Sequence, residues 1–179
     1  MDDNQEIINE YVSKMKIVSK EQLEKIGFFD APASKGHHLA EHGGLAKHSV
    51  NVTKWLLKLT DVMEVIWPRE ESPYIVGMLH DIVKCRCYEF KNCGAEEQIV
   101  YARHPYAGHG AASVAIICAE LEAILYPAEA SAIMHHMGAF GLQGRDLDDF
   151  DGALGIFPRE IIATHTADMM ASRVDEAKD

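Results

Sequence analysis

The sequence predicts an all-α helical bundle that carries a minor β-hairpin. Apolar residues recur with the 3.6-residue period of a helix along most of the chain. Glycine and proline stand at the ends of these runs, where they commonly close a helix or occupy its first turn. Residues 86–101 differ, because short aromatic and β-branched runs flank the turn-forming segment 91–94, and this pattern indicates a hairpin.

The N-terminal part of the chain predicts two helices followed by a loop. Residues 4–17 carry an apolar stripe at helical spacing. A short helix is expected over residues 20–26, with Ser19 as its N-cap and Gly27 closing it. The polar stretch 32–38 predicts a loop before the next helix.

The remaining helices and one long loop follow from the same signals. The stretch from Gly138 to Gly155 is glycine-rich and acidic, and it predicts a functional loop or lid. Proline favours the first turn of a helix, so Pro73 marks a helix start. Helices are expected from Gly43-Gly44 to Leu59, from Pro73 to His80-Asp81, and at about residues 108–125, 127–137 and 158–171.

The chain is expected to form a single domain over residues 1–179. Its core would span about residues 37–172, with the helices of residues 4–26 packing on it. A chain of 179 residues is well above the size at which a hydrophobic core becomes hard to build. Neither an internal repeat nor a linker-like composition divides the sequence.

The composition is typical of a soluble globular protein and excludes several classes of function. The chain is 47% hydrophobic and 25% charged. Its net charge of −11 argues against binding to duplex nucleic acid or an anionic membrane. The acidic N-terminus does not resemble a signal peptide, and no apolar run approaches the roughly 18 residues that span a bilayer. With its four cysteines interpreted as reduced thiols, the expected location is the cytoplasm.

An adjacent histidine and aspartate, His80-Asp81, stand at the end of an apolar run. Both side chains are costly to bury unless each finds a partner. A metal ion can satisfy a neutral imidazole and an ionised carboxylate together. The pair therefore predicts a metal site, provided that other ligands converge on it.

Further histidines and one aspartate lie before and after this pair in the sequence, at intervals of about one helix plus one loop. His48 lies 32 residues before His80, and His109 lies 29 residues after it. Taken singly, His48 or His109 is more simply explained as a hydrogen-bonded core histidine, and Asp168 as the partner of an arginine. Taken together they indicate a shared centre, because stacked helices would direct their inward faces to one point. The expected converging set is His48, His80, Asp81, His109, His135, His136 and Asp168.

This series resembles the HD-domain superfamily of metal-dependent phosphohydrolases. The segment from Gly43-Gly44-Leu45 to His48-Ser49 resembles the opening motif of many such domains, and the likeness covers about residues 37–172. The histidine spacing is similar to that of the HD-GYP phosphodiesterases. No Gly-Tyr-Pro follows His135-His136, which argues against cyclic di-GMP as the substrate. Some members have an acidic residue where this chain has Gly44, so a third metal is not expected.

The resemblance implies an HD-domain helical bundle with two divalent metal ions. His48, His80, Asp81 and Asp168 would hold the first ion. His109, His135 and His136 would hold the second, with Asp81 bridging the two. Iron or manganese is the expected metal, and magnesium, zinc, nickel and cobalt stay open because all suit ligands of this kind.

The expected activity is that of a metal-dependent phosphohydrolase, a phosphoric ester hydrolase acting on a nucleotide or related small phosphoester. Two divalent ions ~3.5–4 Å apart can clamp a phosphoryl oxygen and generate a hydroxide that attacks phosphorus in line. Asp81 and Lys84 are the expected catalytic residues, and Lys84 would also bind a phosphate oxygen as a compact cation. Arg103 and Arg145 are weaker candidates for substrate binding, and His38 is given no role.

Two other classes of function stay open from the sequence. A mixed-valent di-iron oxygenase of the HD type would use a similar set of histidines and aspartates. A non-catalytic regulatory or binding module is disfavoured by the complete ligand set. The expected partner is a small phosphorylated molecule, preferably a nucleotide, and a homodimer is a further expectation.

Overall fold

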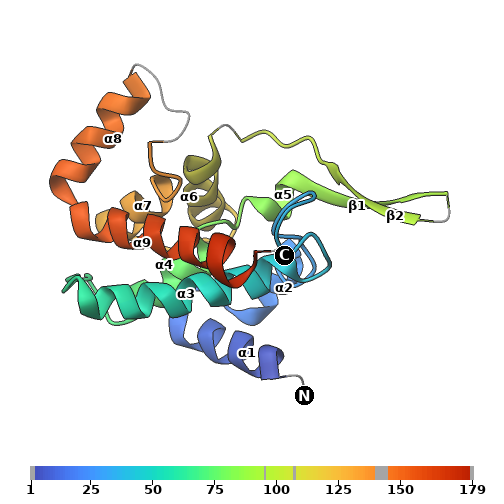
Figure 1. Cartoon of the computed structure of the whole chain (residues 1–179), viewed down its shortest axis with the longest axis horizontal. Coiled ribbons are helices and arrows are strands. Elements are labelled where there is room, and N and C mark those ends of the chain that lie inside the picture. Colours follow the sequence, from blue (N-terminus) through green and yellow to red (C-terminus); the bar gives the residue numbers. More distant parts are fainter. Residues whose placement is uncertain (1–2, 95, 107, 140–144, 178–179) are drawn as a thin grey trace.

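The computed structural model describes residues 3–94, 96–106, 108–139 and 145–177 (Figure 1). The described chain is mainly helical with one two-stranded antiparallel sheet, so the predicted all-α fold with a minor hairpin is confirmed. None of the described helices combines the length and the apolar character that a bilayer crossing requires. The elements are α1 (Asp3–Met15), α2 (Lys20–Ile26), α3 (Gly44–Val62), α4 (Ser72–Leu79), α5 (Lys84–Cys87), β1 (Tyr88–Cys93), β2 (Glu96–Tyr101), α6 (His109–Ala119), α7 (Pro127–Met134), α8 (Arg145–Ile156), α9 (Pro158–Met170) and a π-helical turn (Ala171–Asp175).

The short helix α2 is determined by its caps. Ser19 Oγ accepts a hydrogen bond from Gln22 N at 3.2 Å, and Gln22 Oε1 accepts one from Ser19 N at 2.8 Å. This reciprocal pair satisfies two of the amide groups that a helix N-terminus leaves without partners. Gly27 closes the helix in the left-handed conformation with a φ of 86°. The predicted helix over residues 20–26 is confirmed.

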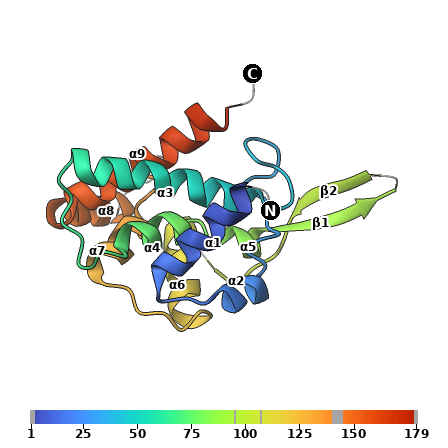
Figure 2. The ribbon, with the colours of Figure 1, turned by 90° about the horizontal axis from the view of Figure 1, so that it is seen from below.

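Helix α3 lies between α1 and α9 and supplies one side of the core (Figures 1 and 2). It packs closely against α4 and α9, and α1 crosses both α3 and α4. Leu45, Val52 and Leu56 are fully buried on one face of this helix. His48 lies on the same face and is also fully buried. The amphipathic pattern of α3 therefore directs an imidazole into the interior.

The strands β1 and β2 form a hairpin that projects from the helical body (Figures 1 and 2). Tyr88 pairs with Tyr101 at its base, and Cys93 pairs with Glu96 near its tip. Ala102 N donates a hydrogen bond of 2.8 Å to the carbonyl oxygen of the residue before β1. This bond closes the base of the hairpin beside α5. The predicted hairpin is confirmed.

The predicted loop over Gly138–Gly155 is wrong for residues 145–155, which lie in helix α8. Asp146 and Asp148 stand in its first turn, where negative charge interacts favourably with the helix dipole. Phe150 is buried and anchors the helix, which packs on α9. The acidic, glycine-rich composition therefore gave no indication of this helix, in which Phe150 is the buried aromatic residue. Residues 140–144 of the predicted loop lie outside the described residues.

Helices α6 and α7 end earlier than predicted, at Ala119 and Met134. After α6 the chain leaves the helical path at Glu122, which has a φ of 52°. After α7 it enters a turn that contains His135 and His136. The two histidines therefore do not share a helical face, and the backbone of the turn determines the direction of each side chain.

Candidate metal centre

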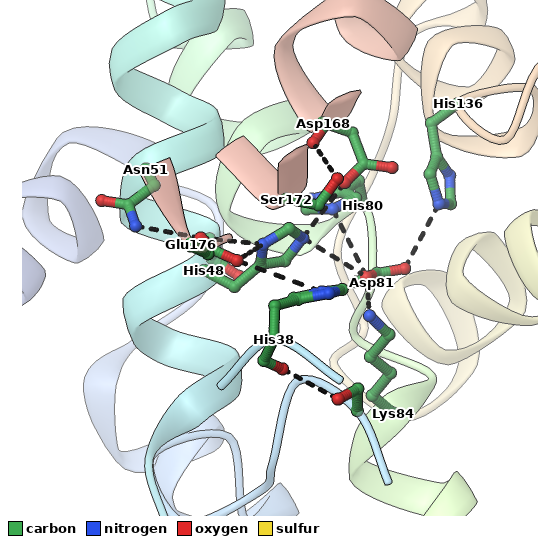
Figure 3. Close-up of polar contacts among 12 residues, drawn as sticks. His38, His48, Asn51, His80, Asp81, Lys84, His136, Asp168, Ser172 and Glu176 are labelled. Carbon is green, nitrogen blue, oxygen red and sulfur yellow. Dashed lines mark hydrogen bonds and ion pairs between the residues drawn. The ribbon is translucent and has the colours of Figure 1, made fainter. Parts of the chain in front are cut away.

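Asp81 lies at the middle of a cluster of polar side chains inside the bundle (Figure 3). It follows the buried apolar end of α4 and is itself 2% exposed. A carboxylate at such a position needs several polar partners to offset the loss of water. Its oxygens lie 2.5 Å from Lys84 Nζ, 2.5 Å from His109 Nε2, 3.2 Å from His136 Nε2, 3.5 Å from His80 Nε2 and 3.7 Å from His48 Nε2.

A close backbone contact brings His109 and His136 together. Gly110, in the first turn of α6, faces the carbonyl oxygen of Met134 at the end of α7. A Cβ atom at this position would lie only 2.1 Å from that oxygen, so a glycine is required for the approach. As a result the ring centroids of His109 and His136 are 5.4 Å apart.

Two of the buried histidines are oriented by carbonyl groups of their own preceding turn. His80 Nδ1 donates a hydrogen bond of 2.9 Å to Gly77 O, and His136 Nδ1 donates one of 2.7 Å to Ile133 O. A carbonyl group only accepts, so Nδ1 carries a proton, and in the neutral ring Nε2 then keeps its lone pair. Within the described part of the chain, the buried Nε2 atoms of His80 and His136 have no hydrogen-bond partner. Such an arrangement is typical of histidines that bind a metal through Nε2.

His48 is oriented by a carboxylate instead. Its Nδ1 lies 3.0 Å from Glu176 Oε2, and Asn51 Nδ2 donates a hydrogen bond of 2.9 Å to Glu176 Oε1. Glu176 reaches α3 because α9 continues into the π-helical turn, which brings the end of the described chain back across α3. On the other side of the ring, His48 Nε2 lies 3.2 Å from Asp168 Oδ1.

The electrostatics of the cluster favour a bound cation. Burial raises the pKa of Asp81, but the charge of Lys84 and the hydrogen bond from His109 oppose this effect, and that pKa lies well below its usual range. Burial likewise opposes ionisation of Asp168, but His48 keeps its pKa low. Burial lowers the pKa of His80 to about 4, so this imidazole is neutral at pH 7. Ionised carboxylates beside a neutral imidazole with a free lone pair form a cation site.

The protonated ring of His48 occupies a position where a metal ion could take the place of a proton. Burial lowers the pKa of this imidazole, but Asp168 and Glu176 outweigh it and raise the pKa to about 9. The ring thus carries a proton between two carboxylates at neutral pH. A metal ion at Nε2 would replace that proton, since ligand histidines bind metals in the neutral form.

The buried histidines and aspartates could hold metal ions. Three groups have ligand atoms that all lie within 4.8 Å of one another. Nitrogen and carboxylate donors in this combination suit divalent transition metals. The donor set therefore fits a metal centre, and the unpaired Nε2 atoms are the observation that supports it. The groups are His48, His80 and Asp168; His80, Asp81 and His136; and His38, His48 and Glu176.

Some residues expected at the site lie elsewhere or cannot be placed. His135 turns away from Asp81 toward α8, with its ring 5.6 Å from that of Phe150. Arg103 is exposed on the segment after β2. Arg145 begins α8, and its side chain lies outside the described residues. The roles assigned to these three residues stay predictions. Lys84, by contrast, does lie against Asp81.

Three residues at the centre were not foreseen from the sequence. Glu176 and Asn51 carry no local motif, and their role arises only when the C-terminal segment docks on α3. His38 was placed on a loop without a role, yet its ring centroid lies 5.1 Å from that of His48 (Figure 3). Its buried Nε2 also lacks a hydrogen-bond partner among the described residues and lies 4.0 Å from Glu176 Oε2.

Comparison with known proteins yields one similar protein of assigned activity. No family profile matches this chain, and no solved structure matches it. A stretch of 68 residues is 41% identical to dihydroneopterin 2',3'-cyclic phosphate phosphodiesterase of Methanocaldococcus jannaschii. That relative is a phosphodiesterase. The match covers 36% of this chain and 27% of the relative, so most of either protein lies outside it.

Proposed function

We propose that this chain is a metal-dependent phosphodiesterase that hydrolyses a small phosphoester. The observation that carries the proposal is the set of buried histidines with unpaired Nε2 atoms around the ionised Asp81. A partial relative that acts on a 2',3'-cyclic phosphate supports the same class of reaction. Cyclic phosphates of nucleosides or of related ring compounds are therefore the first substrates to test.

Two groups of residues would hold the metal. His48, His80, Asp81 and Asp168 would bind one divalent ion, and His109 and His136 would bind a second with Asp81 shared between them. His135 is left out of this set, because its ring packs beside Phe150. Bound divalent ions would supply Lewis-acid activation of the phosphoryl group and of water. Iron or manganese is the preferred choice for these ligands.

The side chains of the chain itself would position the phosphoester. Lys84 lies 2.5 Å from Asp81 and is only 12% exposed, so its charge is held at the centre. Burial opposes this charge, but the carboxylate of Asp81 raises the pKa of Lys84 and keeps the ammonium group protonated. The ammonium group would neutralise a non-bridging phosphate oxygen. The side chain of His109 is 32% exposed, so the open side of the centre lies next to this residue.

Metal content and ester hydrolysis together test the proposal. The protein, purified without chelator, would be analysed for bound metals and assayed with bis-p-nitrophenyl phosphate and 2',3'-cyclic nucleotides, in air and without oxygen. We expect bound metal and oxygen-independent hydrolysis, both strongly reduced in Asp81→Asn. The control Asp61→Asn changes an exposed carboxylate at the end of α3. Absence of bound metal and of hydrolysis with every divalent ion added would refute the proposal.

A further inference from the structure

We infer that two tyrosines and a lysine at the base of the hairpin stack the planar heteroaromatic ring of the substrate. These residues, Tyr88, Tyr101 and Lys35, are called the aromatic shelf below. The inference rests on the proposed function and adds a substrate class to it: phosphoesters whose alcohol carries a flat, nitrogen-containing ring, such as a nucleobase or a pterin.

The two tyrosines form one surface with an accessible ring. Tyr88 and Tyr101 are direct cross-strand partners, so their side chains leave the same face of the hairpin. Their ring centroids are 5.6 Å apart with 36° between the planes. Tyr101 is 70% exposed, so its ring is accessible to a ligand. Lys35 places its ammonium group 4.8 Å from the centroid of the Tyr101 ring.

Helix α5 connects this surface to the metal centre. Lys84 is its first residue, and Tyr88 follows its last residue, so about one helical turn, or roughly 6 Å along the axis, separates them. Burial raises the pKa of the Tyr88 phenol, and the nearby ammonium group of Lys84 opposes that rise. The phosphate side of the centre and the shelf are therefore neighbours.

The loop over residues 34–38 joins the shelf to His38 at the centre. Ser34 Oγ donates a hydrogen bond of 2.8 Å to His38 O and accepts one of 2.9 Å from His37 N. These hydrogen bonds hold the loop in which Lys35 lies over the ring of Tyr101 and the tilted ring of His38 lies beside that of His48. Figure 1 shows the loop beside the base of the hairpin. Both helix α5 and this loop therefore connect the shelf to the centre.

The shelf offers the chemistry that flat aromatic rings require. Stacking on an aromatic side chain is tolerant of the ring's hydrogen-bonding pattern, because each base presents a π face. A lysine beside such a ring adds a cation–π contribution. A substrate that stacks its ring on Tyr101 would extend its phosphoester along α5 toward Lys84. An ester without a ring would lose this contact and keep only the contacts of the phosphate.

Substrates with and without a ring test the shelf. Guanosine 2',3'-cyclic phosphate and a neopterin cyclic phosphate would be compared with glycerol 1,2-cyclic phosphate, which has the same reacting group but no ring. The variant Tyr101→Leu keeps apolar area and removes the π face. Tyr126→Leu is the matched control, because Tyr126 is also exposed beneath a cation, with Arg69 5.0 Å from its ring centroid. Binding of guanosine and neopterin alone, by equilibrium dialysis, gives a readout independent of hydrolysis.

We expect kcat/KM for the ring-bearing esters to fall about tenfold in Tyr101→Leu, with glycerol cyclic phosphate and Tyr126→Leu unchanged. The preferred ring, purine or pterin, is the one for which Tyr101→Leu causes the larger loss of kcat/KM for the ester and of binding for the free compound. Equal hydrolysis of ring-bearing and ring-free esters, unchanged in Tyr101→Leu, would overturn the shelf and leave the phosphodiesterase proposal standing. If no ester is hydrolysed, ring binding decides: loss of binding in Tyr101→Leu supports the shelf, and unaltered or undetectable binding overturns it.

Discussion

His48 and Glu176 are hydrogen-bonded to each other although 128 residues separate them in the chain. The carboxylate lies 3.0 Å from Nδ1 of the imidazole, and this contact directs Nε2 toward Asp81 and Asp168. In metal sites a carboxylate at this position fixes the ring and makes it a better donor. Glu176 is therefore a positioning residue for the proposed centre.

Replacing Glu176 by glutamine is expected to weaken metal binding about 10- to 100-fold. The amide keeps the size of the side chain but loses the charge that supports His48. Competition with a chelating dye would measure the affinity. Asp175→Asn is the matched control, because this neighbouring carboxylate accepts a hydrogen bond of 2.7 Å from Trp55 Nε1 and none from His48. Equal metal affinity of the two variants would contradict the role of Glu176.

Replacing Lys84 by glutamine is expected to separate metal binding from hydrolysis. The cation beside Asp81 competes with a metal for the same carboxylate, so its removal should leave metal content intact or increase it. Hydrolysis should nevertheless fall about 100-fold, because a charge that stabilises the phosphoryl group is lost. Metal analysis and kcat measured on one preparation would check both parts. Lys47→Gln, at an exposed ion pair with Glu41, serves as the control.

A methyl group at Gly110 is expected to disturb the centre through the backbone. In Gly110→Ala the new Cβ would meet Met134 O, forcing α6 away from α7 at a cost of about 1–3 kcal/mol. The separation of His109 and His136 would change with it. Gly152→Ala in α8 has open space around the new atom and should be neutral or stabilise by up to about 1 kcal/mol. Urea unfolding of both variants gives the comparison, and equal destabilisation would contradict the packing argument.

The contact of His42 with the hairpin is expected to weaken as pH rises. His42 Nδ1 lies 2.6 Å from Asp30 Oδ1, its Nε2 lies 2.7 Å from Glu97 Oε2, and its ring stacks on Phe90. Hydrogen bonds to the two carboxylates raise the pKa of His42 above its ordinary value near 6.5. A raised folded-state pKa gives stability that is complete below that ordinary value and is lost as pH rises through the folded-state pKa.

The urea midpoints of wild type and His42→Gln, measured from pH 5.5 to pH 9, would reveal this dependence. The wild type should have the higher midpoint at the acidic end, and the difference should shrink toward the alkaline end. Phe90 ring resonances would report the same change at the hairpin itself. A difference that does not vary with pH would show that stacking, rather than charge, makes the contact.

The parts of the fold that follow from neighbouring residues could be predicted from the sequence. Helix α2 follows from Ser19, Gln22 and Gly27, whose side-chain and backbone preferences act within one or two turns. The convergence of His48 with His80-Asp81 follows from the apolar faces of their helices, since a polar group on such a face has to find partners inside.

The features that the sequence does not reveal depend on tertiary packing. Positions 135 and 136 are both histidine, so the residue type does not indicate which of them faces Asp81. The turn after α7 directs His136 to Asp81 and His135 to Phe150. Helix α8 was missed because its composition is that of a loop, and Phe150 becomes an anchor only against the rest of the fold. Glu176 carries no pattern of its own, because its partner His48 is distant in the chain.

The three buried imidazoles differ in what their orientation requires. His80 and His136 each bond to a carbonyl three residues earlier, so their rings can take the required direction as soon as one turn of backbone forms. Among the described residues, His48 Nδ1 is instead hydrogen-bonded to Glu176, so its orientation depends on the segment that follows α9. Two ring orientations are thus determined locally, and the third is fixed only when the last described segment of the chain docks. Metal affinity should accordingly report on that docking, and the completed site would appear last during folding.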